Sequence, residues 1–238
     1  VSNYTASKKR RKQDDYTPGG VNNRRPDRAV IAYTNLIKRY FKNTVPVVLG
    51  GIEASLRRVS HYDFWSNRVR RSVLFDAKAD ILVYGMGEKA IVELAKDLGQ
   101  KQDYKRIRGI CYVSPDPVPG YIELPSHKEV AESKDLFIKA FDLFYTNCDP
   151  VSAKGLIQKQ DTRFLVQTPP SQTMTANELD HVYGLGYERE LHPYYAKSGK
   201  VRALDTIRFS VTTHRGCYGE CNFCAIAVHE GRTVQSRS

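Results

Sequence analysis

Apolar side chains recur at helical spacing in three stretches, which predict helices over residues 28–41, 90–98 and 133–144. Asp27 precedes the first stretch and suits the N-cap position, where a carboxylate accepts hydrogen bonds from free backbone N–H groups. The third stretch carries an apolar stripe from Leu136 to Phe144, which we interpret as part of the core.

Short apolar runs predict strands between these helices. Residues 45–49 and 79–84 each lead directly into glycines, as buried parallel strands that feed loops do, and residues 109–113 predict another strand. Strand, glycine turn and helix therefore recur, which predicts an α/β fold with a parallel sheet and right-handed crossovers. Both glycine turns fall at the carboxyl ends of predicted strands, where such sheets usually bind ligands.

The other segments divide the chain into three parts. Residues 1–27 combine charge, glycine and proline with little apolar periodicity, so we expect a flexible basic arm. Residues 28–190 form the predicted α/β domain, in which the proline-rich residues 114–126 are expected to be a connector or loop. Residues 191–238 are predicted to hold a linker, a strand over residues 205–213 and a loop with three cysteines.

Cys217, Cys221 and Cys224 place three thiols within eight residues in a CxxxCxxC pattern. Thiolates are soft ligands that select zinc, copper(I) or iron–sulfur clusters, and close spacing lets one loop wrap a metal site. An electron-carrying cluster normally uses four protein thiolates, so three grouped thiolates leave one iron open for another ligand. The pattern therefore indicates a metal centre at which a substrate or cosubstrate can bind.

With an aromatic residue, Phe223, before its last cysteine, this pattern resembles the signature of radical S-adenosylmethionine (radical SAM) enzymes. Further motifs are similar to those of the YgiQ family of bacterial radical SAM proteins, and the resemblance spans about residues 16–238. They are Arg25-Pro-Asp-Arg, Gly50-Gly-Ile-Glu-Ala-Ser-Leu-Arg-Arg, His61-Tyr-Asp-Phe-Trp-Ser, Tyr84-Gly-Met-Gly-Glu and Thr213-His-Arg-Gly-Cys.

The resemblance implies a Rossmann-like N-terminal domain of the cobalamin-binding type, followed by the start of a radical SAM partial (β/α) barrel. It also implies a [4Fe-4S] cluster on Cys217, Cys221 and Cys224, with S-adenosylmethionine bound at the fourth iron. Reductive cleavage of that cofactor would give a 5′-deoxyadenosyl radical that abstracts hydrogen from an unknown substrate, with a flavodoxin or ferredoxin as electron donor. Phe223 would pack near the adenine of S-adenosylmethionine.

Other interpretations of the cysteines stay open. A structural zinc site needs four protein ligands, and His214 or His229 would complete a set of three cysteines and one histidine. Cys111 and Cys148 lie in apolar patterns and are interpreted as core thiols rather than ligands.

A corrinoid-assisted radical SAM transferase is a second alternative, because the glycine turns resemble those of cobalamin-binding domains. The histidine motif DxHxxG that binds cobalt in many such domains is absent from the chain, which argues against cobalamin. Residues 51–65 concentrate charged and aromatic side chains, which would bind an anion or a substrate. The simpler interpretation is that Phe64 and Trp65 pack on the core while Glu53, the two arginines at 57–58 and Asp63 form local ion pairs.

Composition refines this interpretation. The 238 residues are 41% hydrophobic, enough for a sizeable core, and carry a net charge of +11 with several bunched basic residues. Such charge favours an anionic partner such as RNA, so a non-catalytic iron–sulfur or zinc module that binds RNA is a further alternative. No run of eighteen apolar residues and no apolar N-terminal stretch occur, so we expect a cytoplasmic protein without a membrane partner.

Only fourteen residues follow Cys224, whereas a six-unit partial barrel needs about 200 residues. We therefore interpret the chain as a fragment of a longer enzyme and expect the fragment alone to be inactive.

Overall fold

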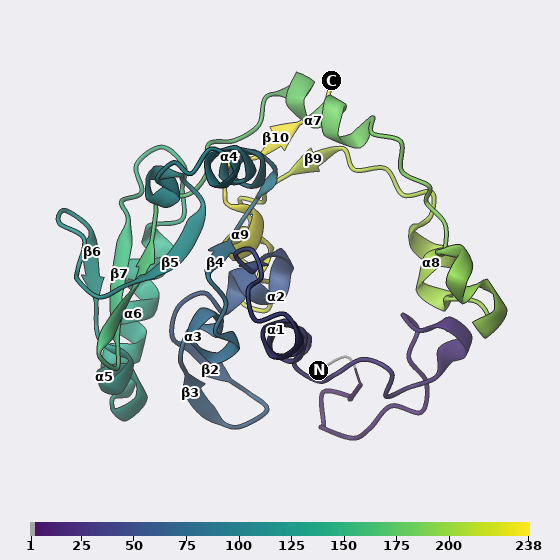
Figure 1. The fold of residues 1–238 in the computed structure, drawn as a ribbon, viewed down its shortest axis with the longest axis horizontal. Coiled ribbons are helices and arrows are strands. Elements are labelled where there is room, and N and C mark those ends of the chain that lie inside the picture. The colour runs from purple at the N-terminus through teal and green to yellow at the C-terminus, as the bar shows by residue number, and fades with distance from the viewer. Residues whose placement is uncertain (1–2) are drawn as a thin grey trace.

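The structure, a computed structural model, describes residues 3–238 and is built around a six-stranded mixed sheet (Figure 1). The strands, in their order across the sheet, are β1 (Val48–Leu49), β4 (Ile81–Val83), β5 (Ile110–Ser114), β8 (Arg163–Gln167), β7 (Leu156–Gln160) and β6 (Ile122–Leu124). The β1–β4 and β6–β7 pairs are parallel, and the three pairings between them are antiparallel. A separate hairpin joins β2 (His61–Asp63) to β3 (Arg68–Arg70).

The predicted α/β class is confirmed, and so are the three strands expected in this region. The first two predicted strands pair in parallel, as expected. The rest of the sheet differs from the predicted parallel arrangement. The predicted strands β4 and β5 pair antiparallel, and the β7–β8 hairpin, which the apolar pattern did not reveal, adds further antiparallel strands. The expected connector over residues 114–126 also contains the short strand β6, which lies at the edge of the sheet next to β7. Edge strands tolerate nearby prolines.

Residues 3–238 contain nine α-helices and three short 3₁₀ turns. The α-helices are α1 (Ala29–Tyr40), α2 (Gly51–Leu56), α3 (Val73–Ala77), α4 (Glu88–Gly99), α5 (His127–Glu132), α6 (Lys134–Thr146), α7 (Ala176–Tyr183), α8 (Arg202–Ile207) and α9 (Ile226–Glu230). The 3₁₀ turns are η1 (Pro18–Gly20), η2 (Tyr104–Arg106) and η3 (Pro193–Ser198). The helices α1, α4 and α6 confirm the three predicted from apolar spacing.

The proposed N-cap role of Asp27 is wrong. Arg28 occupies the N-cap position of α1, with no side-chain cap. The Asp27 carboxylate instead accepts hydrogen bonds from Asn3 Nδ2 at 2.8 Å and from the Tyr4 hydroxyl at 3.2 Å. These partners lie in the N-terminal arm, so the carboxylate holds the arm against the start of α1.

Side chains alternate across the sheet and build a hydrophobic core on each face. Leu82 and Cys111 face one core, which includes α2, α3 and Phe144 of α6. Ile81 and Ile110 face the other, which includes α4. Burial raises the pKa of the Cys111 thiol to about 12, and Cys148 is also buried. Both cysteines are therefore core thiols, as predicted.

The predicted strand over residues 205–213 is wrong. Residues 202–207 form α8 instead, and among the described residues no strand pairs with residues 205–212. A strand needs a neighbour for its N–H and C=O groups, whereas a helix satisfies them locally. The cysteines instead follow the two-residue strand β9 (His214–Arg215), which is antiparallel to β10 (Gln235–Ser236).

The N-terminal arm reaches the segment that carries η3 and α8, on the side of the molecule away from the sheet (Figure 1). Gly19 N donates to Lys200 O at 3.0 Å, and Ala203 N donates to Asp15 O at 2.9 Å. The flexibility of the arm and the three-part division of the chain stay predictions.

Candidate metal centre

The three cysteines lie on the loop that connects β9 to α9. Cys217 N donates to Gly231 O at 3.0 Å, and Gly216 N donates to Glu230 Oε2 at 3.0 Å. Together with the β9–β10 pairing, these bonds hold the two ends of the loop side by side. The segment that carries the sulfurs projects from this fixed base.

Gly216 is a position at the base of the loop where only glycine fits. Its φ is +82°, and a Cβ built there would lie 2.1 Å from Thr233 O. The left-handed backbone and the close approach of the returning chain both exclude a side chain. The glycine that precedes the first cysteine is therefore required by the geometry of the loop.

The thiols of Cys217 and Cys221 lie on the same side of Gly219. A Cβ on Gly219 would be 3.3 Å from Cys217 Sγ and 3.9 Å from Cys221 Sγ. Gly219 N also lies 3.4 Å from Cys217 Sγ, to which it donates. Cys221 is exposed and the other two cysteines are half-buried. The missing side chain leaves space next to two of the three sulfurs.

The thiols are grouped but do not form a closed ligand set. Within residues 3–238 no three His, Cys, Asp or Glu side chains are arranged to hold a metal ion. The donor set nevertheless suits a soft metal or an iron–sulfur cluster, because all three donors are thiols on one short loop. The space beside Gly219 and the exposure of Cys221 leave room for these side chains to converge.

Neither histidine proposed as a zinc ligand joins the cysteines. His214 lies exposed on β9, and its Nδ1 is 2.9 Å from Thr213 Oγ1. His229 lies on α9, where burial lowers its pKa, and its Nδ1 has no hydrogen-bond partner among the described residues. The structure therefore does not assemble the four protein ligands of a structural zinc site from these residues.

Arg215 ties the base of the loop to the domain. Its Nη2 donates to Glu88 Oε1 at 2.9 Å, and its Nε donates to the Tyr183 hydroxyl at 2.6 Å. Glu88 ends the Tyr84-Gly-Met-Gly-Glu motif and begins α4, and Tyr183 ends α7. Two motifs recognised separately in the sequence thus meet in one ion pair, which sequence reasoning missed because 127 positions separate its members.

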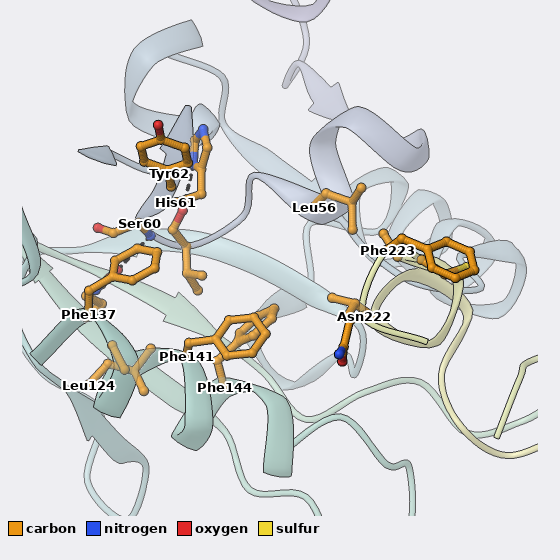
Figure 2. Close-up of a pocket in the computed structure, with 16 residues that line it drawn as sticks. Leu56, Ser60, His61, Tyr62, Leu124, Phe137, Phe141, Phe144, Asn222 and Phe223 are labelled. Atoms are coloured by element: carbon orange, nitrogen blue, oxygen red, sulfur yellow. Dashed lines mark hydrogen bonds between the residues drawn. The ribbon is translucent and has the colours of Figure 1, made fainter. Parts of the chain in front are cut away.

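Beside the loop lies a pocket of about 360 Å³. Asn222, Phe223 and Cys224 form one side, and the rings of Phe137 and Phe141 on α6 form another (Figure 2). Phe223 is 93% exposed. Its predicted contact with an adenine stays a prediction, but the side chain does lie at an accessible edge next to a cysteine.

The glycine turn after β4 does not form the expected ligand crevice. Gly85 has a φ of +72°, and a Cβ there would lie 3.4 Å from His229 O. The cavity beside it measures about 30 Å³, which suits a water molecule rather than a corrinoid. Helix α9 covers this end of the strand because it packs next to α2 (Figure 1).

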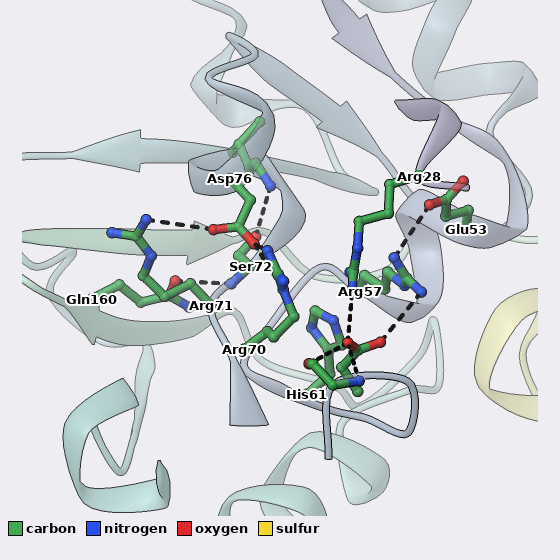
Figure 3. Close-up of polar contacts among 12 residues, drawn as sticks. Arg28, Glu53, Arg57, His61, Arg70, Arg71, Ser72, Asp76 and Gln160 are labelled. Atoms are coloured by element: carbon green, nitrogen blue, oxygen red, sulfur yellow. Dashed lines mark hydrogen bonds and ion pairs between the residues drawn. The ribbon is translucent and has the colours of Figure 1, made fainter. Parts of the chain in front are cut away.

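Four charged side chains between residues 51 and 65 were predicted to form ion pairs, and three of them do so. Arg57 bonds to Glu53 Oε1 at 3.3 Å (Figure 3). Asp63 accepts from Arg28 at 2.7 Å. Burial acts to raise the pKa of Asp63, but hydrogen bonds from Ser66 and Arg28 hold that pKa well below its usual value. The exception is Arg58, which is buried without a carboxylate partner among the described residues.

The aromatic pair in the same segment departs from the prediction. Phe64 is 58% exposed rather than packed on the core. Lys8 Nζ lies 4.7 Å from the centre of the Phe64 ring, and the Tyr4 ring lies 4.5 Å from that of Trp65. These rings contact the N-terminal arm because the β2–β3 hairpin projects away from the sheet (Figure 1).

Several of the bunched basic residues are neutralised within the protein. Arg70 and Arg71 both pair with Asp76 (Figure 3). Arg71 also pairs with Asp161. Arg25 donates to both carboxylate oxygens of Asp14. These contacts are side-chain ion pairs of the fold, so they reduce the positive charge offered to a polyanion such as RNA.

None of the helices between residues 3 and 238 combines the length and hydrophobicity that a membrane span requires.

Comparison with known proteins identifies related chains. Residues 1–210 match the protein family described as Radical SAM N-terminal. Over the whole of this chain, UPF0313 proteins from Fusobacterium nucleatum, Thermotoga maritima and Clostridium botulinum strain 657 are 59%, 54% and 49% identical. The matched part is 42%, 42% and 38% of their respective lengths. The chain therefore spans about two fifths of these relatives.

Proposed function

Because the chain belongs to the Radical SAM N-terminal family, we propose that it is part of a YgiQ-type radical SAM enzyme in which Cys217, Cys221 and Cys224 hold a [4Fe-4S] cluster. The observation that carries the proposal is a loop with three thiols whose base is fixed while its sulfurs stay accessible. When bound and reduced, such a cluster supplies the electron for cleavage of S-adenosylmethionine to a 5′-deoxyadenosyl radical, which removes hydrogen from a substrate.

The residues around the thiols suit this role. The hydrogen bonds from Cys217 N and Gly216 N close the base of the loop. The three thiols therefore lie on one loop whose two ends are held together. Arg215 holds that base against Glu88 and Tyr183 of the domain. Because Gly219 has no side chain, the sulfurs on either side of it have space to meet a common ligand.

The exposure of the loop supports access for an electron donor. Tyr218 is 82% exposed and Phe223 is 93% exposed, so the thiols lie at the surface of this chain. A small redox protein such as a flavodoxin or ferredoxin would approach there. A reducing, cytoplasmic setting suits thiolate ligands and stays our prediction.

Anaerobic reconstitution tests the proposal. The chain incubated with iron and sulfide should retain about four of each per chain, as a [4Fe-4S] cluster requires. Added S-adenosylmethionine should alter the electron paramagnetic resonance signal of the dithionite-reduced protein. The longer Fusobacterium nucleatum relative, treated in the same way, should release 5′-deoxyadenosine. Zinc bound without iron would show that the loop is a structural metal site instead.

A further inference from the structure

A second pocket, of about 310 Å³, lies between the N-terminal arm, α1 and the β2–β3 hairpin. Its lining draws on three motifs that were recognised separately in the sequence, and the proposed cluster uses none of their residues in this pocket. These residues are Asp27 and Arg28 from the first motif, Arg57 from the second, and Asp63 and Trp65 from the third. The fold therefore gathers charged and aromatic side chains from distant segments in one concave site.

The two guanidinium groups of this pocket have donors to spare. Arg28 Nη2 donates to Asp63 Oδ2 at 2.7 Å, but Arg28 Nη1 is buried without a hydrogen-bond partner among residues 3–238. Arg57 Nη1 donates to Glu53 Oε1 at 3.3 Å, whereas its Nη2 lies 3.9 Å from Asp63 Oδ1, too far for a hydrogen bond. Figure 3 shows the side chains of Arg28 and Arg57 converging. A buried donor without a partner costs free energy, which an acceptor group of a ligand would recover.

The two carboxylates of the pocket have acceptor capacity to spare, because a carboxylate offers about four lone-pair sites. Asp27 accepts one hydrogen bond on each oxygen, from the Asn3 amide and the Tyr4 hydroxyl, and it has no cationic partner in the described part of the chain. Asp63 Oδ1 accepts no hydrogen bond from residues 3–238, and its ion pair with Arg57 spans 3.9 Å. An ammonium group, with three donors and no acceptor, matches such oxygens.

The charges in the lining balance. Two guanidiniums and two carboxylates give the pocket a formal charge of zero, although the net charge of the chain is +11. A ligand with one sign of charge would be attracted by one pair and repelled by the other, whereas a zwitterion is attracted by both. The rest of the lining is apolar or aromatic, with Ile31 and Ala32 on α1 and the stacked rings of Tyr4 and Trp65. The volume falls in the range of about 300 to 1,000 Å³ that is typical of small-molecule pockets.

We propose that this pocket binds a small zwitterion with an apolar side chain, of the free α-amino acid class. The carboxylate of the ligand meets Arg28 and Arg57, and its ammonium group meets Asp27 and Asp63. Its side chain lies against Trp65 and the apolar side of α1. The inference goes beyond the cluster proposal and does not rest on it, because no lining residue belongs to the cysteine loop.

Trp65 is the only tryptophan of the chain, so tryptophan fluorescence reports directly on the pocket. Three probes with one carbon framework test the need for both charges. L-phenylalanine carries both charged groups, 2-phenylethylamine only the ammonium, and 3-phenylpropionate only the carboxylate. The iron-free chain should bind one equivalent of L-phenylalanine, with a saturable change in emission and a matching calorimetric titration. Each single-charge probe should bind about tenfold more weakly, because it lacks one set of charge-assisted hydrogen bonds. Equal affinities, or no saturable binding of L-phenylalanine, would overturn the proposal.

Substitutions assign each charged group of the ligand to its partner. Arg57→Gln should weaken binding of L-phenylalanine about tenfold but should not weaken binding of 2-phenylethylamine. Asp27→Asn should weaken binding of both ammonium-bearing probes but not of 3-phenylpropionate. Arg68→Gln and Asp116→Asn are the matched controls, because both residues are exposed and lie outside the lining. Unchanged affinity for L-phenylalanine in both pocket variants would place its binding elsewhere and contradict the assignment.

The pattern across the probes separates contact with the ligand from a loss of structure. Arg57 also pairs with Glu53, so Arg57→Lys, which keeps the positive charge, is the conservative variant and should retain most of the affinity for L-phenylalanine. Circular dichroism checks that each variant is folded. Weakening of all three probes by the same factor in Arg57→Gln and Asp27→Asn would show a general disturbance of the pocket rather than the assigned contacts, and would refute them.

Discussion

Arg58 Nε donates a hydrogen bond to Gln167 Oε1 at 2.9 Å, and 109 positions separate these two residues. Each is only 1% exposed. The guanidinium also donates from Nη1 to Ser55 O and lies 4.4 Å from the ring centres of Tyr84 and Phe144. A buried cation without a carboxylate is thus stabilised by carbonyl oxygens and by two aromatic faces. Through it, α2, α6 and β8 are joined.

We expect Arg58→Ala to lower the free energy of unfolding by about 3 kcal/mol, because it leaves a cavity and removes the partner of Gln167 Oε1. Urea denaturation followed by circular dichroism measures the change. Arg68→Ala is the control, since Arg68 is exposed on β3 and has no ion pair among the described residues. Equal effects of the two substitutions would show that the buried contacts of Arg58 contribute little.

Replacing any one of Cys217, Cys221 and Cys224 by alanine should abolish retention of iron after anaerobic reconstitution, because two thiolates do not hold a four-iron cluster. Iron and sulfide per chain are the measurement. Cys148→Ala, which changes a buried thiol outside the loop, should retain the iron content of the unchanged chain. A cysteine-loop variant with full iron content would refute the ligand assignment.

Gly216→Ala should destabilise the base of the loop by about 2 kcal/mol or more and reduce iron retention. The added Cβ would meet Thr233 O at 2.1 Å in a backbone with φ of +82°. Gly231→Ala is the matched control, because Gly231 also has a positive φ, of +90°, but an added Cβ there would have no atom within 4 Å. The Gly216 variant should therefore be the less stable of the two in thermal unfolding, and the reverse order would contradict the observed contact.

The stability of the chain should fall as the pH is lowered from about 6.5 to about 4. Burial lowers the pKa of His61 from 6.5 to about 4 in the folded chain, so the unfolded chain binds more protons across this window. Burial also lowers the pKa of His127 and of His229, which acts in the same direction. The contribution of His61 is present above pH 6.5 and is on the order of 2 kcal/mol.

Urea midpoints at pH 7 and pH 5 measure this effect. His61→Gln should reduce the difference between the two midpoints, whereas His181→Gln, at an exposed position on α7, should leave it unchanged. A midpoint difference that is the same in both variants would show that His61 does not titrate as the structure indicates.

Local sequence patterns predicted the helices and strands that form because of the spacing of nearby apolar residues. Helices α1, α4 and α6 follow from apolar residues at helical spacing, and β1 and β4 follow from short apolar runs before glycine. The strand expected over residues 205–213 failed because alternation is only a tendency, and a strand forms only where a neighbour accepts its hydrogen bonds. No such neighbour lies beside residues 205–212 in the described chain, so α8 forms there.

The sequence by itself determined the donor set, because Cys217, Cys221 and Cys224 lie within eight residues and their chemistry does not depend on distant parts of the chain. Only the tertiary structure decided what surrounds that set. The Arg215–Glu88 ion pair joins positions 127 residues apart, and a pocket lies between α6 and the cysteine loop. Such contacts depend on how the sheet and helices pack, and packing brings together residues whose positions no local periodicity relates.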